Sequence, residues 1–290
     1  LAIKLAISFM IIFLVLRKLE LIKIKETLLG ANPLLLLICL LFVGISLFLM
    51  VLKWKILIDK LQTKKLSELY ATYWASDFMS LFGFGSVGSE IYKMISFNNK
   101  KKALVLSLVD KAYSFFWYIL FFISIVIVYF SFKEFNYLHL ILSIVLYYLL
   151  VFTYLIFEKR ILKSKCLKKL KMFKKIKNSN GLPKKELIKH ATISVLFKIN
   201  TFILYSIILF SVGIKFNLML FAFLSALTIL TTLPISFQGL GVREFILLAY
   251  SNFMGYNGEL IIAGSFLIFL LFLIFRIFGV IPFLMNKKDN

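Results

Sequence analysis

The chain has 290 residues, 61% of them apolar, and a formal net charge of +22. Soluble domains are nearer half apolar, whereas several tracts here run for about 18 residues or more with few charges, as transmembrane helices do. The charge does not favour a nucleic-acid partner, because the basic residues lie between apolar spans and are not interleaved with aromatic residues. We therefore expect one all-α, polytopic integral membrane domain over residues 1–290.

The apolar tracts predict six spans. The first is read as a span and not as a removed signal peptide, since no small-residue cleavage site follows it. Asn32-Pro33 opens the second, because proline is tolerated at a helix start. Lys53-Trp54-Lys55 is expected to close that span at the membrane interface. The spans are expected at 1–16, 33–52, 103–130, 138–157, 191–213 and 259–285.

Residues 158–189 differ in composition from the rest of the chain. They hold 13 Lys or Arg and two Glu, so they carry +11, half of the net charge. The positive-inside rule makes this segment a cytoplasmic loop. Its lysines can touch anionic lipid headgroups, although a solvated loop accounts for them more fully. Two cysteines and two histidines are scattered along the chain with no metal-binding spacing, so we expect no metal, cofactor or disulfide.

Polar and glycine-rich sequence interrupts the apolar pattern at two places, 83–93 and 233–244. Short helices are expected beside them. Both ends of the first break face basic, cytoplasmic sequence, and both ends of the second face short, nearly neutral connectors. The first should therefore be a re-entrant hairpin from the cytoplasm, and the second a re-entrant hairpin from outside. Together with the flanking spans they form an inverted repeat typical of transporters. The alternative is two ordinary spans with glycine kinks. Helices are expected at 66–82, 217–233 and 243–255, and the connectors 131–137, 214–216 and 256–258 are expected outside.

The charges at the breaks suggest a binding site. Glu90 and Lys93 lie three apart, on one helical face. Arg243 and Glu244 are adjacent, so we expect them to point apart and to pair with other elements, with Glu90 or Asp110 reaching Arg243 near the midplane. Arginine recognises phosphate or carboxylate with two donors, although a structural salt bridge explains Arg243 as well. The candidate substrate-binding residues are Ser86, Gly88, Glu90, Lys93, Asp110, Ser236, Gln238, Gly239, Gly241, Arg243, Glu244 and Arg276.

Leu-Pro-Ile-Ser-Phe-Gln-Gly-Leu-Gly-Val-Arg-Glu at 233–244 resembles the P-x-S-x-x-G-x-G-x-R-E motif of flippase-like membrane proteins, the transmembrane region of lysylphosphatidylglycerol synthases. Gly-Ser-Val-Gly-Ser-Glu-Ile-Tyr-Lys at 85–93 is similar to that family's G-S-x-G-G-D-x-x-R. Asp110-Lys111 and Lys53-Trp54 also resemble family pairs. The first motif departs from the family pattern at four positions, Phe84, Ser89, Glu90 and Lys93.

The resemblance implies a module that binds or flips a lipid, with membrane lipids, anionic ones above all, as partners. In the full synthases a soluble domain transfers lysine from tRNA to phosphatidylglycerol. This chain ends five residues after Met285, so lysyl transfer by the chain alone is not expected. No hydrolase or nucleotide-binding signature appears, and no enzyme is predicted. The expected function is therefore an inner-membrane lipid translocase or lipid-binding module, with both termini cytoplasmic. An accessory subunit of a lipid-modifying or glycosyl-transferring enzyme stays open, as does a homodimer.

Overall fold

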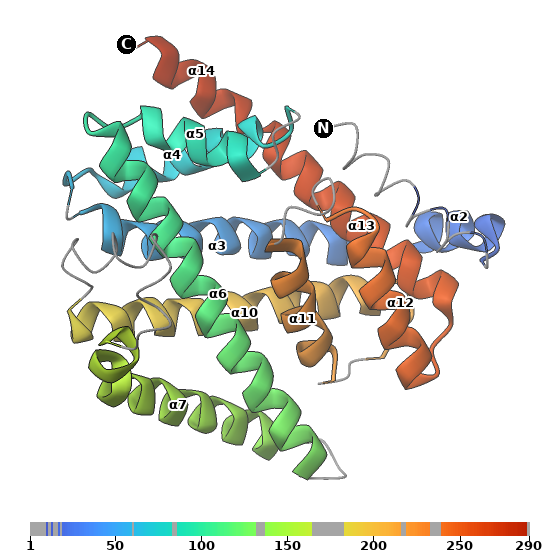
Figure 1. Cartoon of the computed structure of the whole chain (residues 1–290). Helices are drawn as coiled ribbons and strands as arrows, with labels where there is room; N and C mark the ends of the chain where they lie inside the picture. The colour runs from blue at the N-terminus through green and yellow to red at the C-terminus, as the bar shows by residue number, and fades with distance from the viewer. Residues whose placement is uncertain are drawn as a thin grey trace.

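The computed structural model describes residues 19–59, 61–82, 86–131, 137–163, 183–215, 219–232 and 239–288, with isolated residues before position 19. These ranges contain helices and no strand (Figure 1), which confirms the all-α prediction. The helices are α2 (Leu21–Gly30), α3 (Pro33–Ile58), α4 (Leu66–Met79), α5 (Ser86–Ile95), α6 (Lys100–Ser131), α7 (Tyr137–Lys163), α10 (Lys184–Ser211), α11 (Leu220–Thr232), α12 (Val242–Met254), α13 (Gly258–Ile277) and α14 (Val280–Lys288).

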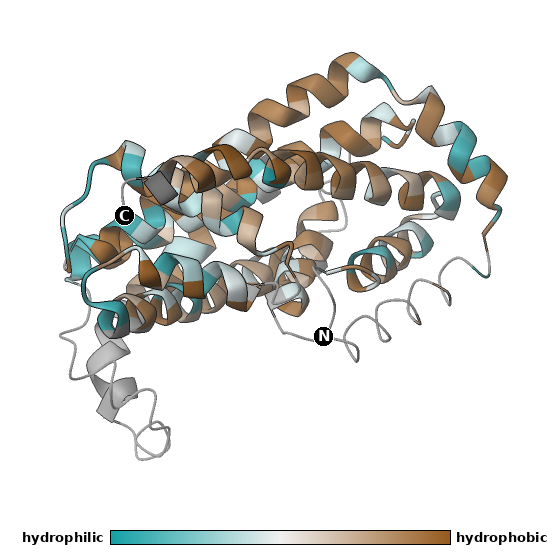
Figure 2. Ribbon diagram, turned by 90° about the horizontal axis from the view of Figure 1, so that it is seen from above, coloured by the Kyte–Doolittle hydropathy of each residue, from teal (hydrophilic) through white to brown (hydrophobic). Residues whose placement is uncertain are grey.

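Four apolar helical stretches are long enough to cross a membrane, as expected of a multi-pass membrane protein. They confirm the second, third, fifth and sixth predicted spans, and α7 covers the fourth. Hydrophobic residues dominate the long helices, while hydrophilic ones gather near helix ends and connections (Figure 2). The predicted first span lies mostly outside the described residues. The four stretches are Pro33–Ile58, Lys102–Val128, Lys184–Ser211 and Gly258–Met285.

Three boundaries differ from the prediction. The helix α3 continues to Ile58, so Lys53-Trp54-Lys55 lies inside it instead of closing it at an interface. The basic segment 158–189 is helical where it is described, because α7 ends at Lys163 and α10 begins at Lys184. No helix was predicted between the first two spans, yet residues 21–30 form α2. In each case the chain continues or starts a helix because its backbone stays hydrogen-bonded through residues that are polar but helix-compatible.

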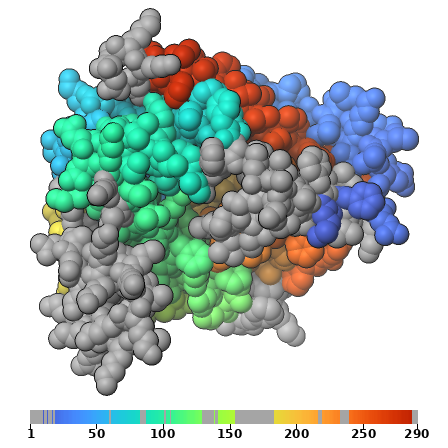
Figure 3. Space-filling model, turned by 45° about the horizontal axis from the view of Figure 1, so that its top comes forward, coloured from blue at the N-terminus to red at the C-terminus, as the bar shows by residue number. Residues whose placement is uncertain are grey.

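The predicted sixth span is interrupted at Gly279, between α13 and α14. A Cβ atom at this position would lie 2.6 Å from the carbonyl oxygen of Trp74 and 2.9 Å from that of Arg276. Only glycine allows so close a backbone approach. The break therefore lets α14 pack on α4, where Figure 3 shows the α13–α14 segment beside α4 and α5.

The two interrupted segments each form a helical hairpin, α4 with α5 and α11 with α12. The helices α4, α5, α11 and α12 have 14, 10, 13 and 13 residues. At about 1.5 Å per residue each reaches roughly 15–21 Å, less than the roughly 30 Å of a hydrocarbon core. Helices of this length suit hairpins that enter a membrane without crossing it. The side from which each hairpin enters stays a prediction.

The contacts between helices in the first half of the chain have counterparts in the second half. In the first half α3 contacts α4 and α6, and α5 contacts α6. In the second half α10 contacts α11 and α13, and α12 contacts α13. Contacts across the halves repeat as well: α6 packs on α7, α10 and α11, and α13 packs on α2, α3 and α4. This is the contact pattern that a structural repeat produces.

The helices α3 and α10 pair along their lengths at the centre of the bundle (Figure 1). The thiol of Cys39 lies 4.0 Å from the carbonyl oxygen of Leu204. Further along α3, the Asn200 amide donates to the Phe42 carbonyl at 2.9 Å and to the Ser46 hydroxyl at 2.8 Å. Numbers fall along α10 as they rise along α3, so the pair is antiparallel. An antiparallel central pair is what an inverted repeat requires.

Candidate functional site

Buried charge gathers where α3, α5, α6 and α10 meet. We use the term charged cluster for Lys53, Glu90, Lys93, Asp110, Lys111, His190 and Lys198. All of these except Lys111 are buried. Such residues inside a membrane bundle are costly and are retained chiefly where they pair or face a ligand or water. The structure brings three of the predicted residues, Glu90, Lys93 and Asp110, into this one cluster.

Glu90 binds two lysines through one oxygen. Its Oε1 lies 2.8 Å from Lys93 Nζ and 3.0 Å from Lys111 Nζ. The first distance confirms that the i and i+3 side chains share a face of α5. The other oxygen, Oε2, is buried and accepts no hydrogen bond from the described residues. Because an unfilled acceptor is costly to bury, this oxygen is suited to a donor from water or a ligand.

Lys93 also lies over aromatic rings. Its Nζ is 4.5 Å from the ring centre of Tyr73 and 5.7 Å from that of Trp54. The negative face of an aromatic ring attracts a cation at these distances. Trp54 in turn packs edge-to-face on Tyr73, with centroids 5.8 Å apart. Trp54 therefore packs beside the charged cluster and does not anchor the helix at the membrane interface.

Asp110 joins α6 to α3 and α10. Its Oδ1 lies 2.8 Å from His190 Nε2, and its Oδ2 lies 4.0 Å from Lys53 Nζ. Trp117 Nε1 donates to His190 Nδ1 at 3.2 Å. Since an indole nitrogen can only donate, Nδ1 must accept, and the ring proton is on Nε2, where it is donated to Asp110. His190 is therefore neutral in this arrangement and adds no charge. Lys53 also donates to the Ser114 hydroxyl at 2.7 Å.

The charged cluster holds more positive than negative charge. Its buried part contains three lysines, Lys53, Lys93 and Lys198, against two carboxylates, Glu90 and Asp110. The half-exposed Lys111 adds a fourth ammonium. An excess of buried positive charge favours an anionic ligand, because an anion offsets part of the cost of desolvating the ammonium groups.

The second break holds a separate ion pair. Arg243 Nη2 lies 2.7 Å from Glu244 Oε1, and Arg243 Nε lies 3.1 Å from the same atom. The expectation that these neighbours point apart was wrong: the guanidinium turns back onto the adjacent carboxylate. Ser265 on α13 holds both, accepting from Arg243 Nε at 2.9 Å and donating to Glu244 Oε1 at 2.7 Å. The ion pair of Arg243 is thus with Glu244 and not with Glu90 or Asp110.

Two glycines turn the chain into α12. Gly239 and Gly241 have φ values of +79° and +84°, which side chains with a Cβ rarely adopt. This confirms their predicted role in the turn. The Gly241 amide donates to Glu244 Oε2 at 2.7 Å, so the carboxylate fills the start of α12. The place that an anion could take at this helix start is therefore occupied by a carboxylate of the chain itself.

The two breaks share a contact pattern. Glu90 near the start of α5 pairs with Lys111 on α6, and Glu244 near the start of α12 pairs with Ser265 on α13. In both cases the partner is 21 residues further along the chain. The same spacing in both halves supports the repeat that the sequence motifs indicated.

Arg276 lies on α13, a helix that packs on both α4 and α12. It interacts electrostatically with Asp77 on α4 and with Tyr205 on α10. Asp77 is also within electrostatic reach of Lys93 and Glu90, and Tyr205 is within reach of the second ion pair. Arg276 therefore connects the electrostatic environments of the two breaks. The close approach of the two turns themselves stays a prediction.

Several predicted residues lie beyond what the structure describes. Ser236 and Gln238 are in this group, as are the first-break glycines at 83 and 85. Ser86 begins α5, but its side chain is outside the description. Gly88 lies on α5 and is half-buried. The connector 131–137 and most of the basic segment 158–189 are likewise outside.

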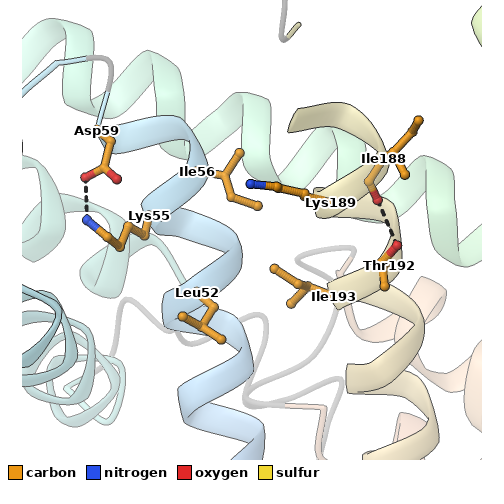
Figure 4. A pocket seen from close by; sticks show the side chains of 8 residues that line it. All are labelled: Leu52, Lys55, Ile56, Asp59, Ile188, Lys189, Thr192 and Ile193. Carbon is orange, nitrogen blue, oxygen red and sulfur yellow. Dashed lines mark hydrogen bonds and ion pairs between the residues drawn. The ribbon is translucent and has the colours of Figure 1, made fainter. Parts of the chain in front are cut away.

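A groove of about 380 Å³ lies between α3 and α10, near the end of each helix that carries lysines (Figure 4). Its walls are aliphatic, and Lys55 and Lys189 stand at its rim. Lys55 is paired with Asp59 at 2.7 Å. The groove is lined by Leu52, Lys55, Ile56, Asp59, Ile188, Lys189, Thr192 and Ile193.

Sequence reasoning missed four members of the charged cluster. Lys111 was noted only beside Asp110, as part of a family pair. Lys53 was read as an interfacial residue, His190 as isolated, and Lys198 was not singled out. For Lys198 a signal existed, because a lone lysine within an apolar span is by itself a functional indication. For Lys53 and His190 no local signal distinguishes a buried partner from a residue at a span end.

Helices of spanning length, two hairpins and buried charge define a multi-pass helical membrane protein. Residues 1–279 match the family described as the lysylphosphatidylglycerol synthase TM region. The chain belongs to this family, as the motifs at 85–93 and 233–244 indicated. No curated protein and no solved structure matches the chain. A membrane protein of a lipid-modifying, flippase-related family is the function that these findings support directly.

Proposed function

We propose that the chain is a lipid translocase, or a lipid-binding module, that takes an anionic phospholipid headgroup into the charged cluster from the inner membrane. The observation that carries the proposal is the excess of buried lysines over buried carboxylates. Ammonium groups bind phosphate oxygens strongly in surroundings without water. The family resemblance favours a lipid as the ligand, and the lysines of the charged cluster favour an anionic one.

The architecture supports movement as well as binding. Hairpins in each half and an antiparallel central pair are the parts from which alternating-access transporters are built. Glu90 Oε2, which lacks a donor among the described residues, adds a place for a headgroup hydroxyl or ammonium. A headgroup held by lysines and a carboxylate would be oriented as well as neutralised. Both termini are proposed to be cytoplasmic.

The test is translocation of fluorescent phosphatidylglycerol in proteoliposomes, followed by quenching from one side. Wild-type protein should speed the exchange over protein-free vesicles and favour phosphatidylglycerol over phosphatidylcholine. Lys93→Met should slow it by roughly tenfold or more, the equivalent of about 1.4 kcal/mol. The matched control is Lys25→Met, on the exposed surface of α2, which should leave the rate unchanged.

Wild-type vesicles that neither bind anionic lipid nor move any lipid would contradict the proposal. Binding without movement would retain the lipid-binding module and reject the translocase. The fold of each variant is checked by its melting temperature in detergent, so that a loss of activity is not confused with a loss of structure.

A further inference from the structure

Lys198 is the one lysine of the charged cluster for which the described residues supply no carboxylate. It lies on α10 with only 2% of its surface exposed. Its Nζ donates to the Thr228 hydroxyl on α11 and lies 4.2 Å from the ring centre of Tyr118 on α6. Within the ranges given above, no ion pair is formed by this ammonium.

The charged groups around Lys198 do not balance it. Lys53 on α3 faces the same ring, 5.8 Å from the Tyr118 centre, and repels Lys198 electrostatically. Asp110 on α6 is already shared between Lys53 and His190. Thr228 on α11 contributes only a hydroxyl. Its proton is already donated to the Leu224 carbonyl at 2.9 Å. These neighbours on α3, α6 and α11 thus offer no free negative charge to Lys198.

Burying an ammonium without a partner costs several kcal/mol even after relaxation. The side chain either gives up its proton or is balanced by an anion from outside the chain. An anion beside Lys198 would relieve the repulsion between the Lys53 and Lys198 ammonium groups, which lie over the same Tyr118 ring and can each donate to an oxyanion. A phosphate group, with several acceptor oxygens, suits such a set of donors.

We propose that Lys198, with Lys53, binds the phosphate of an anionic membrane lipid between α6, α10 and α11, while Thr228 on α11 holds the Lys198 ammonium in place. The inference rests on the proposed function and specifies where its headgroup is held. A zwitterionic choline lipid would bring a further cation into surroundings that already carry excess positive charge, so phosphatidylglycerol is the better ligand. Because α6 belongs to the first half and α11 to the second, the bound phosphate touches both halves of the repeat.

The experiment measures lipid retained by the purified full chain. Protein is equilibrated with mixed phosphatidylglycerol and phosphatidylcholine, and the bound lipids are counted by native mass spectrometry. Wild type should retain phosphatidylglycerol in preference. Lys198→Met should lower that retention by roughly 30-fold, as expected when one partner of a buried charge pair is lost. Lys198→Arg should restore binding. The control is Lys25→Met, an exposed lysine on α2 outside both the charged cluster and the groove, which should leave the retention unchanged.

A second measurement covers the stability of the variant. In lipid-free detergent Lys198→Met should melt no lower than wild type, because it removes an unbalanced charge and keeps an unbranched side chain. Added phosphatidylglycerol should then raise the melting temperature of wild type and not of the variant. Inorganic phosphate is tested alongside: if it stabilises wild type and phosphatidylglycerol does not, the site takes free phosphate and the lipid assignment is wrong.

The two proposals fail in different ways. If Lys198→Met retains as much phosphatidylglycerol as wild type, Lys198 is a neutral core residue and this inference is overturned. The proposed function then rests on the remaining lysines of the cluster, Lys53, Lys93 and Lys111. If wild type itself shows no preference for phosphatidylglycerol, the proposed function and the inference are both overturned.

Discussion

The guanidinium of Arg243 and the carboxylate of Glu244 are adjacent in sequence and still form a buried pair. Side chains at i and i+1 do not ordinarily face each other on a helix. Here they sit in the first turn of α12, where Glu244 bends back to the Gly241 amide and Ser265 holds both groups. Arg243 is thereby occupied within the protein, and the lysines of the charged cluster are the better candidates for contact with a headgroup.

This pairing predicts a structural cost for losing Arg243. Arg243→Ala should lower the free energy of unfolding by roughly 3–5 kcal/mol, because Glu244 is left buried without a counter-charge. Arg243→Met combined with Glu244→Gln should recover most of that loss, since glutamine can still accept from the Gly241 amide. The measurement is thermal or chemical unfolding in detergent.

The control for that prediction is the Lys55–Asp59 pair on α3, which has the same 2.7 Å separation but is about a third exposed. Lys55→Ala should cost less than about 1 kcal/mol, because water replaces the lost partner. If Arg243→Ala and Lys55→Ala lower the free energy of unfolding equally, the structural role of Arg243 is contradicted. If Arg243→Ala strongly reduces transport at unchanged stability, Arg243 belongs to the binding site.

At the scale of elements, the second hairpin depends on a tight turn into α12. The turn before α12 needs a positive φ at Gly239 and again at Gly241. Gly239 also packs closely, since a Cβ there would lie 3.0 Å from Thr231 Cγ2. Such a turn brings α11 back against α12 within a few residues. Glycine at these positions is a requirement of the backbone, independent of any ligand.

Gly241→Ala should therefore destabilise the second hairpin. A Cβ at φ of +84° costs roughly 1–2 kcal/mol, and displacement of the amide would also weaken its bond to Glu244. The control is Gly30→Ala at the end of α2, where a Cβ meets nothing within 4 Å; it should be neutral or slightly stabilising. Melting temperatures of the two variants in detergent give the comparison, and an unchanged melting temperature for Gly241→Ala would argue against the strained turn.

At the scale of the whole molecule, the repeat is carried by contacts between elements and by the antiparallel α3–α10 pair. Glu90 and Glu244 have equivalent partners, yet the two halves differ in chemistry. The first break opens onto lysines and an unfilled carboxylate oxygen, whereas the second is closed by its own arginine. The two related breaks thus differ: one leads to the charged cluster, and the other holds the Arg243–Glu244 ion pair. A headgroup can therefore bind at the charged cluster and not at the ion pair.

The membrane orientation of this bundle is predicted from its basic segments. In a background without Cys39 and Cys166, Lys133→Cys in the 131–137 connector should react with an impermeant thiol reagent added outside intact cells. Lys175→Cys in the basic segment should react only after the cells are opened. The opposite labelling pattern would reverse the topology, and external labelling at both positions would remove the basis for an inverted repeat.

The sequence by itself determined the class of protein, the number and order of most spans, the two breaks and the family. Each of these depends on properties that are local in the chain: apolar length, glycine and proline, and motifs of a few residues. The i and i+3 pairing of Glu90 with Lys93 was predictable for the same reason, because helical geometry places them on one face.

Only the tertiary structure decided which charges meet. Lys53 and His190 appeared to end spans, but longer helices and the packing of α3 and α10 on α6 bring them both to Asp110. Arg243 was expected to pair with a carboxylate of another segment. Instead Glu244 bends back toward the Gly241 amide and pairs with Arg243. The energy of a buried charge depends on its partners, and those partners come from elements up to about a hundred residues away, such as Asp110 and His190, 80 positions apart. Local pattern does not encode such pairings, so the charged cluster became visible only in the folded chain.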